Sequence, residues 1–318
     1  DIRRNAKALE EIIRDEAVDI VHARSRAPAW AGERAARATK TPFVTTYHGT
    51  YSENSSLKKR YNAVMAKGQP TIAISEFIAE LVQNRYKKPA SEIVVIPRGA
   101  DINIFAEELV STPRTIALAE RWGVADDPRP IVLLPARLSP WKGHNTLIAA
   151  AKGLKERAAA AGTTPDLNIV FSGGGSSAAA DKLLKAIDDA GVNDLVRWVD
   201  HTADMEAAYK LSAVVVSAST EPEAFGRVAV EAQAMGRPVI ATAHGGSLET
   251  IDAGQTGWLY PPGDATALAD AIEEALALDS SGRAHMGMAG RARIRSRFTI
   301  DAMKRATLQV YEDAAIPR

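Results

Sequence analysis

Short apolar runs alternate with helical patterns along the first third of the chain. Runs rich in β-branched residues predict buried strands, and apolar residues that recur every three or four positions between them predict helices. The strands are expected at Val18–His22, Phe43–Tyr47, Thr71–Ile74 and Ile93–Ile96, and the helices at Asp1–Asp15, Ala27–Ala38, Leu57–Ala66 and Glu76–Arg85. This strand–helix–strand repetition indicates parallel βαβ units.

A second alternating series follows residues 101–130, which are polar and proline-rich and predict a linker around a short helix. Its strands are expected at Ile131–Leu134, Leu167–Phe171, Val196–Val199, Ala213–Ser217, Pro238–Thr242 and Gly257–Tyr260. Its helices are expected at His144–Ala160, Ala178–Ala190, Asp204–Tyr209, Arg227–Met235, Ser247–Ile251, Ala265–Leu278, Ser281–Arg297 and Ile300–Ala314. The strands are continuously apolar, as in a sheet that helices cover on both faces.

The predicted fold class is α/β, with two tandem Rossmann-like domains that face each other across a ligand-binding cleft. We expect an N-terminal domain over residues 1–115, a C-terminal domain over residues 116–298, and a final helix within residues 299–318 that crosses back to the first domain. The N-terminal domain has too few predicted strands for a complete Rossmann-like sheet. We therefore expect it to lack its first βαβ portion.

Composition narrows the class of protein. The 318 residues fit two domains of about 150 residues each. Lys and Arg number 39 and so do Asp and Glu, so the chain lacks the excess of cations that a nucleic-acid binder needs. No apolar run approaches the roughly 18 residues that span a bilayer. There is no Cys, which excludes disulfides, thiolate metal sites and Cys nucleophiles and is compatible with the cytoplasm.

The segment from Glu221 to Glu231 carries the strongest chemical signal. It follows a predicted strand and enters a helix near Gly226, whose lack of a side chain lets a ligand approach the backbone. The N–H groups at that helix start form an anion site. Glu231, on the second turn, is placed to bind a vicinal diol such as that of ribose. The alternative is that Glu223 caps the helix and Glu231 is a solvated surface residue.

A second segment, residues 136–143, directly follows the strand predicted at Ile131–Leu134. Arg137 and Lys142 place two cations in one strand-to-helix loop, and Gly143 opens the helix. Two such cations neutralise a diphosphate, and each charge-assisted contact contributes about 1.5–3 kcal/mol. The alternative is two ordinary surface cations.

These two segments resemble the retaining nucleotide-sugar glycosyltransferases of family 4, which have the GT-B fold. Glu223, Phe225, Gly226 and Glu231 match the family's Glu-x-Phe-Gly-x-x-x-x-Glu motif. Residues 136–143 match its Gly-Arg-Leu-x-x-x-Lys-Gly loop, except that Ala136 replaces the first Gly. The resemblance covers essentially the whole chain and is strongest over residues 131–260. It implies transfer of a sugar, with retention, from a UDP- or GDP-sugar to a glycan or lipid-linked acceptor.

The resemblance also implies roles for particular residues. Arg137 and Lys142 would hold the diphosphate, and Glu231 the ribose hydroxyls. Glu223 would hold sugar hydroxyls, with Ala224 and the N–H groups of Phe225 and Gly226 nearby. His48, at the end of a predicted strand, would lie beside the transferred sugar. The catalytic set expected is therefore His48, Glu223, Arg137 and Lys142, and the product is expected to belong to a bacterial envelope polysaccharide or lipopolysaccharide.

Two other functions remain open. Gly173, Gly175 and Ala178 fit the Gly-x-Gly-x-x-Gly/Ala fingerprint of NAD-dependent enzymes, with Asp200 at the end of the next strand. However, a complete strand–helix unit precedes this loop, and family 4 also has a glycine-rich loop here, so Gly173 and Gly174 join the donor-binding set. The second alternative is a truncated, non-catalytic protein that binds a nucleotide sugar.

The remaining expectations concern metals, membranes and the acceptor. No Asp-x-Asp loop follows a predicted strand, so neither a metal nor a cofactor is expected. Basic clusters at Lys58–Tyr61 and Arg291–Arg297 predict peripheral contact with the inner face of a membrane, or else are solvated surface. Arg24 and Arg26 follow the first strand, where they would meet an acidic or phosphorylated acceptor; surface cations are the alternative.

Overall fold

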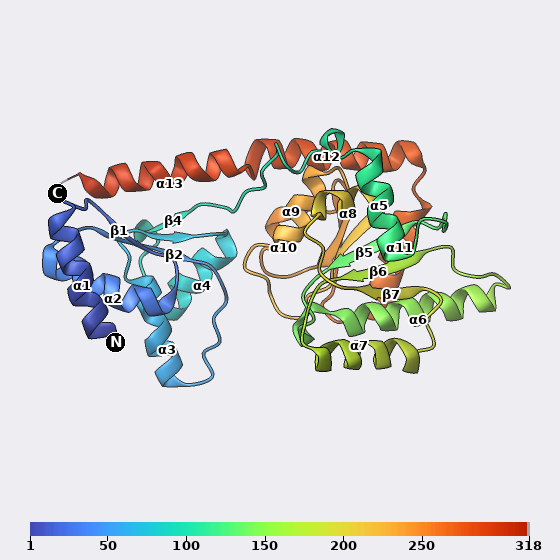
Figure 1. Cartoon of the computed structure of the whole chain (residues 1–318), viewed down its shortest axis with the longest axis horizontal. Helices are drawn as coiled ribbons and strands as arrows, with labels where there is room; N and C mark the ends of the chain where they lie inside the picture. Colours follow the sequence, from blue (N-terminus) through green and yellow to red (C-terminus); the bar gives the residue numbers. More distant parts are fainter. Residues whose placement is uncertain (317–318) are drawn as a thin grey trace. The chain divides into compact units, whose positions relative to one another are not determined.

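The computed structural model describes residues 1–316 and divides the chain into two compact units (Figure 1). Unit 1 comprises residues 1–99, residues 223–225 and the chain from Ile300 onward. Unit 2 comprises residues 100–222 and 226–299. The chain thus enters unit 2 earlier than residue 115, because Val110 is buried in the core of unit 2 beside Leu118 and Trp122.

Unit 1 is built around a parallel sheet of four strands in the order β1-β2-β3-β4. Its elements are α1 (Ile2–Asp15), β1 (Val21–Ala23), α2 (Arg26–Thr39), β2 (Phe43–Tyr47), α3 (Ser56–Asn62), η1 (Ala63–Ala66), β3 (Thr71–Ala73), α4 (Glu76–Tyr86), η2 (Ala90–Glu92), β4 (Ile93–Val95) and α13 (Ile300–Ala315). Helix α13 supplies Val310 to a core that contains Val44, Ile72 and Ile96. The last described helix therefore covers the sheet formed by the start of the chain.

Four predictions in unit 1 needed correction. Strand β1 covers Val21–Ala23 instead of Val18–His22, because its pairing with β2 starts at Val21 opposite Phe43. The strands predicted at Thr71–Ile74 and Ile93–Ile96 each end one residue earlier. The helix predicted at Leu57–Ala66 divides into α3 and the 3-10 helix η1.

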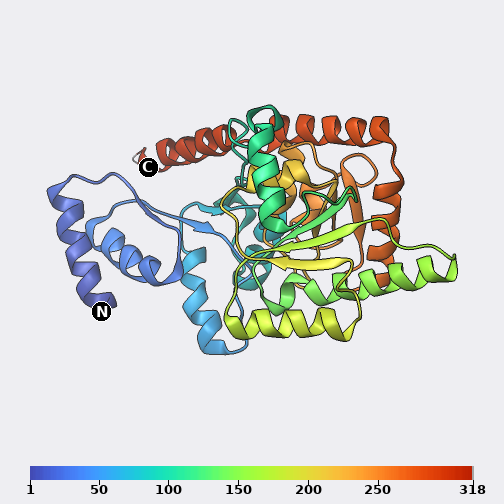
Figure 2. The same cartoon turned by 45° about the vertical axis from the view of Figure 1, so that its right-hand side comes forward.

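Unit 2 holds a parallel sheet of six strands in the order β10-β9-β8-β5-β6-β7, and Figure 2 shows β5, β6 and β7 side by side. Its elements are η3 (Glu107–Leu109), α5 (Thr112–Trp122), β5 (Ile131–Pro135), η4 (Pro140–Lys142), α6 (His144–Ala160), β6 (Asn168–Ser172), α7 (Ser177–Asp189), β7 (Val196–Val199), α8 (Met205–Leu211), β8 (Val214–Ser217), α9 (Arg227–Ala234), β9 (Val239–Thr242), α10 (Ser247–Thr250), β10 (Gly257–Tyr260), α11 (Ala265–Ala277) and α12 (Ser280–Arg297). The predicted α/β fold class, with two Rossmann-like units, is confirmed.

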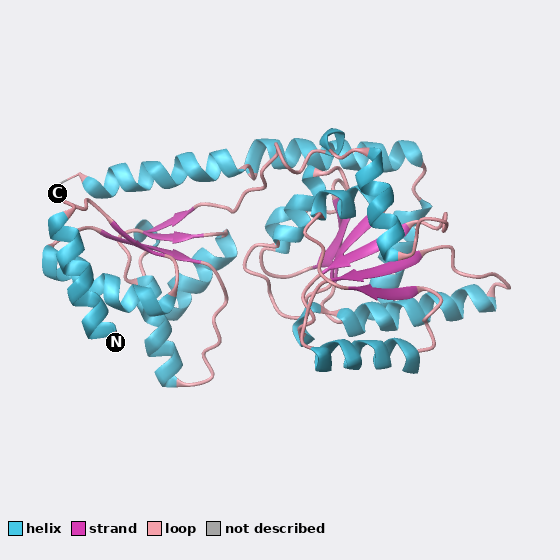
Figure 3. Cartoon of the chain, viewed as in Figure 1, coloured by secondary structure: helices cyan, strands magenta, loops and turns pink. Residues whose placement is uncertain are grey.

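Helices cover both faces of the six-stranded sheet (Figure 3). Neighbouring residues of a strand point to opposite faces, so Val132 and Leu134 join one buried cluster while Ile131 and Leu133 join the other. The segment predicted as a linker contributes to the second cluster, because α5 buries Leu118 and Trp122 there. Residues 101–130 are therefore part of unit 2 rather than a free connection.

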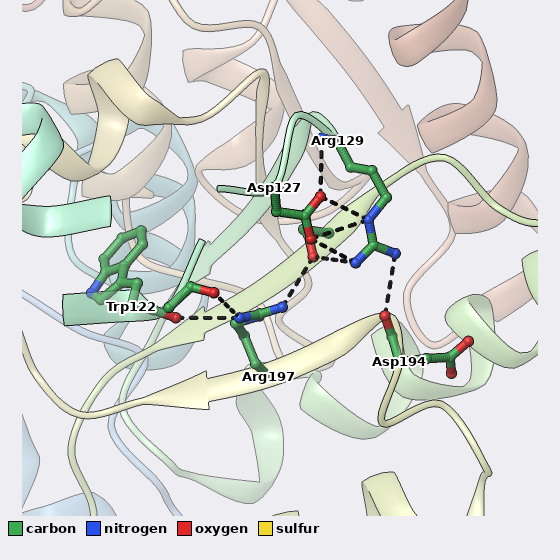
Figure 4. Close-up of polar contacts among 7 residues, drawn as sticks. Trp122, Asp127, Arg129, Asp194 and Arg197 are labelled. Atoms are coloured by element: carbon green, nitrogen blue, oxygen red, sulfur yellow. Dashed lines mark hydrogen bonds and ion pairs between the residues drawn. The ribbon is translucent and has the colours of Figure 1, made fainter. Parts of the chain in front are cut away.

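The amino ends of β5, β6 and β7 are tied together by arginines (Figure 4). The Arg129 guanidinium binds the Asp127 carboxylate at 2.7 Å and donates to the carbonyl of Asp194 at 3.2 Å. Arg197, on β7, donates to the carbonyls of Trp122 and Gly123. These contacts fix one end of the sheet, opposite the carboxyl ends at which ligands of parallel sheets bind. Within residues 1–316, no helix is both long and apolar enough to cross a bilayer.

Candidate functional site

The strand order of unit 2 reverses between β5 and β8. The chain runs from β5 outward to β6 and β7, and then returns to β8 on the other side of β5. Ligands of open parallel sheets bind beyond the carboxyl ends of the strands at such a switch point. The loops that leave β5 and β8 carry the two segments singled out in the sequence, so topology and sequence indicate the same place.

The loop after β5 is folded tightly by its own backbone. The Lys142 N–H donates to the Ser139 carbonyl at 3.0 Å, and Gly143 then caps α6 with a φ of +77°. A Cβ at Gly143 would lie 1.8 Å from the carbonyl oxygen of Ala218, so only glycine fits this contact with the loop after β8. Arg137 is exposed, and the Lys142 ammonium lies 4.1 Å from the centre of the Trp141 ring.

The loop after β8 leads into α9 through Gly226, whose φ of +86° favours glycine. The Thr220 N–H donates to the Trp141 carbonyl at 2.7 Å, which joins the loop after β8 to the loop after β5. The first N–H groups of a helix have no partner within it. The arrangement therefore combines two cations from one loop with the N-terminus of α9, which suits an anionic ligand.

Glu231 lies on the second turn of α9, with its side chain 12% exposed. The Arg227 guanidinium binds its Oε1 at 2.7 Å, and the Tyr209 hydroxyl donates to its Oε2 at 3.0 Å. Burial, and secondarily the neighbouring Glu231 carboxylate, raise the pKa of Tyr209 well above its ordinary value. Tyr209 therefore remains a donor, and the Tyr209 hydroxyl and the Arg227 guanidinium together fix the position of the Glu231 side chain.

The glycine-rich loop after β6 packs directly against the loop after β5. A Cβ on Gly173 would lie 2.0 Å from the Ala136 carbonyl oxygen, and one on Gly175 would lie 2.6 Å from the Cβ of Leu138. The Leu138 N–H also donates to the Gly174 carbonyl at 3.0 Å. These close contacts explain why glycines occupy this loop, and no bound dinucleotide is needed to explain them. In addition, the loop follows β6, whereas the switch point lies between β5 and β8.

The motif from Glu223 to Glu231 is divided between the two units. Residues 223–225 group with unit 1, where Ser75 Oγ donates to the Ala224 carbonyl at 2.6 Å. Ser75 also caps α4 by accepting from the Ile78 N–H at 3.1 Å. Phe225 is buried and Glu223 is half-buried. Gly226 and Glu231 belong to unit 2.

His48 directly follows β2 in unit 1. Its Nδ1 is buried and has no hydrogen-bond partner. Burial lowers the pKa of His48 to about 4, and Arg98, Arg24 and His22 lower it further. At neutral pH the imidazole is therefore uncharged, and it can accept or donate a hydrogen bond to a sugar hydroxyl without adding positive charge.

A cavity of about 320 Å³ lies in unit 1, between the sheet and α13. Its polar lining includes Arg24, Arg98 and Lys304, and its apolar lining includes Ile72 and Leu308. The cavity therefore suits a ligand with an anionic group and an apolar part. Arg26 does not line it, because its guanidinium donates to Asn62 Oδ1 at 2.9 Å and lies 4.5 Å from the Tyr51 ring centre.

Two polar residues escaped the sequence analysis. Tyr209 contacts Glu231 across two helices, and no local pattern marks it. His22 bridges the Tyr311 hydroxyl at 2.6 Å and Thr46 Oγ1 at 2.7 Å, and only its position in a strand was apparent. Within the part of the chain that the structure describes, no group of three or more His, Cys, Asp or Glu side chains is placed to hold a metal ion.

Two protein-family models match the chain. The model described as "Glycosyl transferases group 1" matches residues 120–293, and the model described as "Glycosyltransferase Family 4" matches residues 2–104. The two matches fall almost entirely on unit 2 and unit 1, respectively.

The chain is also similar to curated relatives and to solved structures. It is 31% identical to a D-inositol 3-phosphate glycosyltransferase of Xylanimonas cellulosilytica, over 93% of this chain and 72% of the relative. It is 28% identical to a GDP-mannose-dependent phosphatidylinositol monomannoside mannosyltransferase of Mycolicibacterium smegmatis, over 90% of this chain and 74% of the relative. A glycosyltransferase structure from Rickettsia africae aligns with a TM-score of 0.89 at 34% identity, over 100% of this chain and 82% of that one. Anabaena HepE, solved with UDP, aligns with a TM-score of 0.84 at 26% identity, over 97% of this chain and 82% of HepE.

Proposed function

Because the chain belongs to glycosyltransferase family 4 and is a glycosyltransferase, we propose that it binds a nucleoside-diphosphate sugar on unit 2 and transfers the sugar with retention of configuration. The observation that carries the donor assignment is the contact between the loops after β5 and β8 at the switch point of the sheet. One loop supplies Arg137 and Lys142, and the other leads to the N-terminus of α9 and to Glu231.

In this proposal each group acts on one part of the donor. Arg137 and Lys142 bind the diphosphate together with the first N–H groups of α9, and Glu231 accepts from the ribose hydroxyls. Cations and backbone dipoles fixed in advance stabilise the charge that develops on a departing diphosphate, and no metal is needed for that role. Glu223, with Ala224 and Phe225, binds hydroxyls of the sugar. The resemblance to the family assigns His48 to the transferred sugar and favours an internal-return mechanism.

The names of the relatives narrow the substrates that we propose. One relative uses GDP-mannose, and HepE was solved with UDP and with UDP-glucose, so both nucleotides remain candidates for this chain. The relatives act on inositol 3-phosphate and on a phosphatidylinositol mannoside. We propose a phosphate-bearing acceptor of a bacterial envelope glycan or glycolipid. The cations Arg24, Arg98 and Lys304 around an apolar cavity support this proposal.

The first test is a binding panel of UDP, GDP, UDP-glucose, GDP-mannose and NAD, with and without EDTA, read by thermal shift and calorimetry. A ligand that binds only the folded state raises the unfolding midpoint. We expect one nucleoside diphosphate to bind in the presence of EDTA. Glu231→Ala should weaken it about 10- to 100-fold, the range for hydrogen bonds to a charged group.

Lys142→Ala separates the diphosphate from the nucleoside. It should weaken binding of the diphosphate more than binding of the bare nucleoside, whereas Glu231→Ala should weaken both. Unchanged affinities in both variants would contradict the site. A shift with NAD alone would favour the dinucleotide alternative, and nucleotide binding without turnover on any phosphorylated polyol or glycolipid would favour a non-catalytic binding protein.

A further inference from the structure

Both carboxylate oxygens of Glu231 accept hydrogen bonds, and the two donors differ in how firmly they are held. The Tyr209 hydroxyl, which donates to Oε2 at 3.0 Å, belongs to a fully buried side chain. The Arg227 guanidinium, which donates to Oε1 at 2.7 Å, belongs to a side chain that is 73% exposed. Of the two contacts, the one with Arg227 is therefore the one that a ligand can displace.

Arg227 occupies a position at which a helix disfavours a cation. It is the first residue of α9, directly after Gly226, and the N-terminus of a helix carries a partial positive charge. The order of the pair is also unfavourable, because an acidic residue four positions before a basic one stabilises a helix better than the reverse. Exposed helix pairs of this spacing change an equilibrium constant by only about twofold. The bond between Arg227 and Glu231 therefore adds little to the stability of the fold.

The same position becomes favourable when an anion lies at this end of α9. The proposed diphosphate site combines Arg137 and Lys142 with the first N–H groups of the helix, and Arg227 is the residue that opens that helix. Because its side chain is largely exposed, the guanidinium can turn away from Glu231 without uncovering the core. The family motif specifies no residue type between Gly226 and Glu231, so the motif does not account for an arginine here.

Given the proposed donor site, on which this role rests, we propose that Arg227 is a third cation of that site. It releases Glu231 Oε1 to the ribose hydroxyls and binds the diphosphate in exchange. Glu231 keeps its bond from the buried Tyr209 hydroxyl, while the guanidinium exchanges a carboxylate for phosphate oxygens, which it binds with the same paired N–H geometry. A nucleoside alone must displace Arg227, whereas a nucleoside diphosphate gives it a new partner. The exchange therefore makes the site favour the complete nucleoside diphosphate.

Calorimetric titration with three kinds of ligand tests the exchange: inorganic pyrophosphate, the nucleosides uridine and guanosine, and the nucleoside diphosphates UDP and GDP. Arg227→Leu should weaken binding of pyrophosphate and of the nucleoside diphosphate about tenfold, the lower end of the range for hydrogen bonds to a charged group. The loss for pyrophosphate should shrink as salt is raised. The same change should strengthen binding of the matching nucleoside about twofold, because the guanidinium no longer competes with the ribose for Glu231.

Two further variants separate the local effect of Arg227 from net charge and from folding. Arg227→Lys keeps the cation and should retain most of the pyrophosphate affinity that Arg227→Leu loses. Lys152→Leu is the matched control, because Lys152 precedes Glu156 by four positions on α6 of the same unit and both side chains are exposed. It removes one positive charge outside the donor site and should leave all three affinities unchanged. Equal unfolding midpoints in urea show that each variant keeps the fold.

Unchanged pyrophosphate affinity in Arg227→Leu, or an equal loss in Lys152→Leu, would overturn the proposal. So would weaker binding of the nucleoside, because Arg227 would then hold Glu231 in place for the ribose instead of competing with it. The donor site is tested separately by Glu231→Ala and Lys142→Ala. If these two variants lose nucleotide and Arg227→Leu does not, only the role of Arg227 fails. If the original chain binds neither UDP nor GDP, the donor site and the role of Arg227 fail together.

Discussion

At the scale of single residues, Tyr209 decides how well Glu231 is oriented. Its hydroxyl is buried and donates to Glu231 Oε2 at 3.0 Å, while the other oxygen is bound by the exposed Arg227. Tyr209→Phe should therefore weaken nucleoside-diphosphate binding about fivefold, since a net hydrogen bond contributes about 1 kcal/mol. Binding of inorganic pyrophosphate should not change. Calorimetric titration of both ligands measures the difference.

Tyr260→Phe provides a matched control in the same unit. The Tyr260 hydroxyl is also buried, but it has no hydrogen-bond partner, so its removal should leave both affinities unchanged and should not lower stability. If Tyr209→Phe weakens pyrophosphate and nucleotide equally, Tyr209 supports the fold and does not orient Glu231.

The residues of the candidate site were predictable to different degrees. Arg137, Lys142 and Glu231 stand in segments whose local spacing marks them, so the sequence alone was enough to single them out as candidates. Tyr209 lies 22 positions before Glu231, and the two meet only because α8 and α9 pack on the same face of the sheet. For Arg26 the local signal pointed the other way. Its position after a strand suggested contact with an acceptor, whereas in the structure its guanidinium contacts Asn62 and the Tyr51 ring.

At the scale of elements, the turn before β5 is the clearest case of an electrostatic tie (Figure 4). Hydrogen bonds from Arg129 hold the pKa of Asp127 well below its ordinary value. The carboxylate therefore stabilises the fold above its unfolded pKa of about 3.9, and this contribution is lost as the pH falls below that value. Asp127→Asn should cost about 1 kcal/mol at pH 7, as expected for a well-formed pair near the surface.

Urea unfolding at pH 7 and at pH 3 tests this tie. The difference between the original chain and Asp127→Asn should shrink at the lower pH, because the unfolded chain then binds a proton at Asp127 while the folded chain keeps the carboxylate ionised. Asp126→Asn is the control: the neighbouring carboxylate is exposed, and most surface substitutions change stability by no more than about 0.5 kcal/mol. A loss from Asp127→Asn that is the same at both pH values would assign its role to packing.

Element types followed from the sequence more readily than element ends. The predicted bounds of β2 and α6 were correct, because a β-branched run and a glycine-started helical pattern are local signals. The predicted bounds of β1 were wrong because the pairing with β2, which no residue of β1 specifies by itself, decides where the strand starts. The linker prediction failed for a similar reason, since Leu118 and Trp122 become core residues only against the six-stranded sheet.

At the scale of the whole molecule, three histidines link stability to pH: His144 is buried, and His22 and His48 are half-buried. Burial is the main cause that lowers the pKa of His22, His48 and His144 to about 4 each, against about 6.5 in an unfolded chain. Between these values the unfolded chain binds protons that the folded chain excludes, so stability falls as the pH drops from about 6.5 to about 4. Both units take part, since His22 and His48 lie in unit 1 and His144 in unit 2.

Calorimetry in buffers of different ionisation enthalpy counts the protons taken up on unfolding. Near pH 5 these histidines should contribute up to three protons, one for each side chain that is neutral when folded and charged when unfolded. His144→Gln should lower the count by close to one, because its imidazole stacks edge-on against Phe171 in the core of unit 2, where a charge is strongly disfavoured. A count that His144→Gln does not change would mean that this histidine is already protonated in the folded protein. That charge would then lie close to Lys142, and the proposed donor site would present one more cation to a diphosphate.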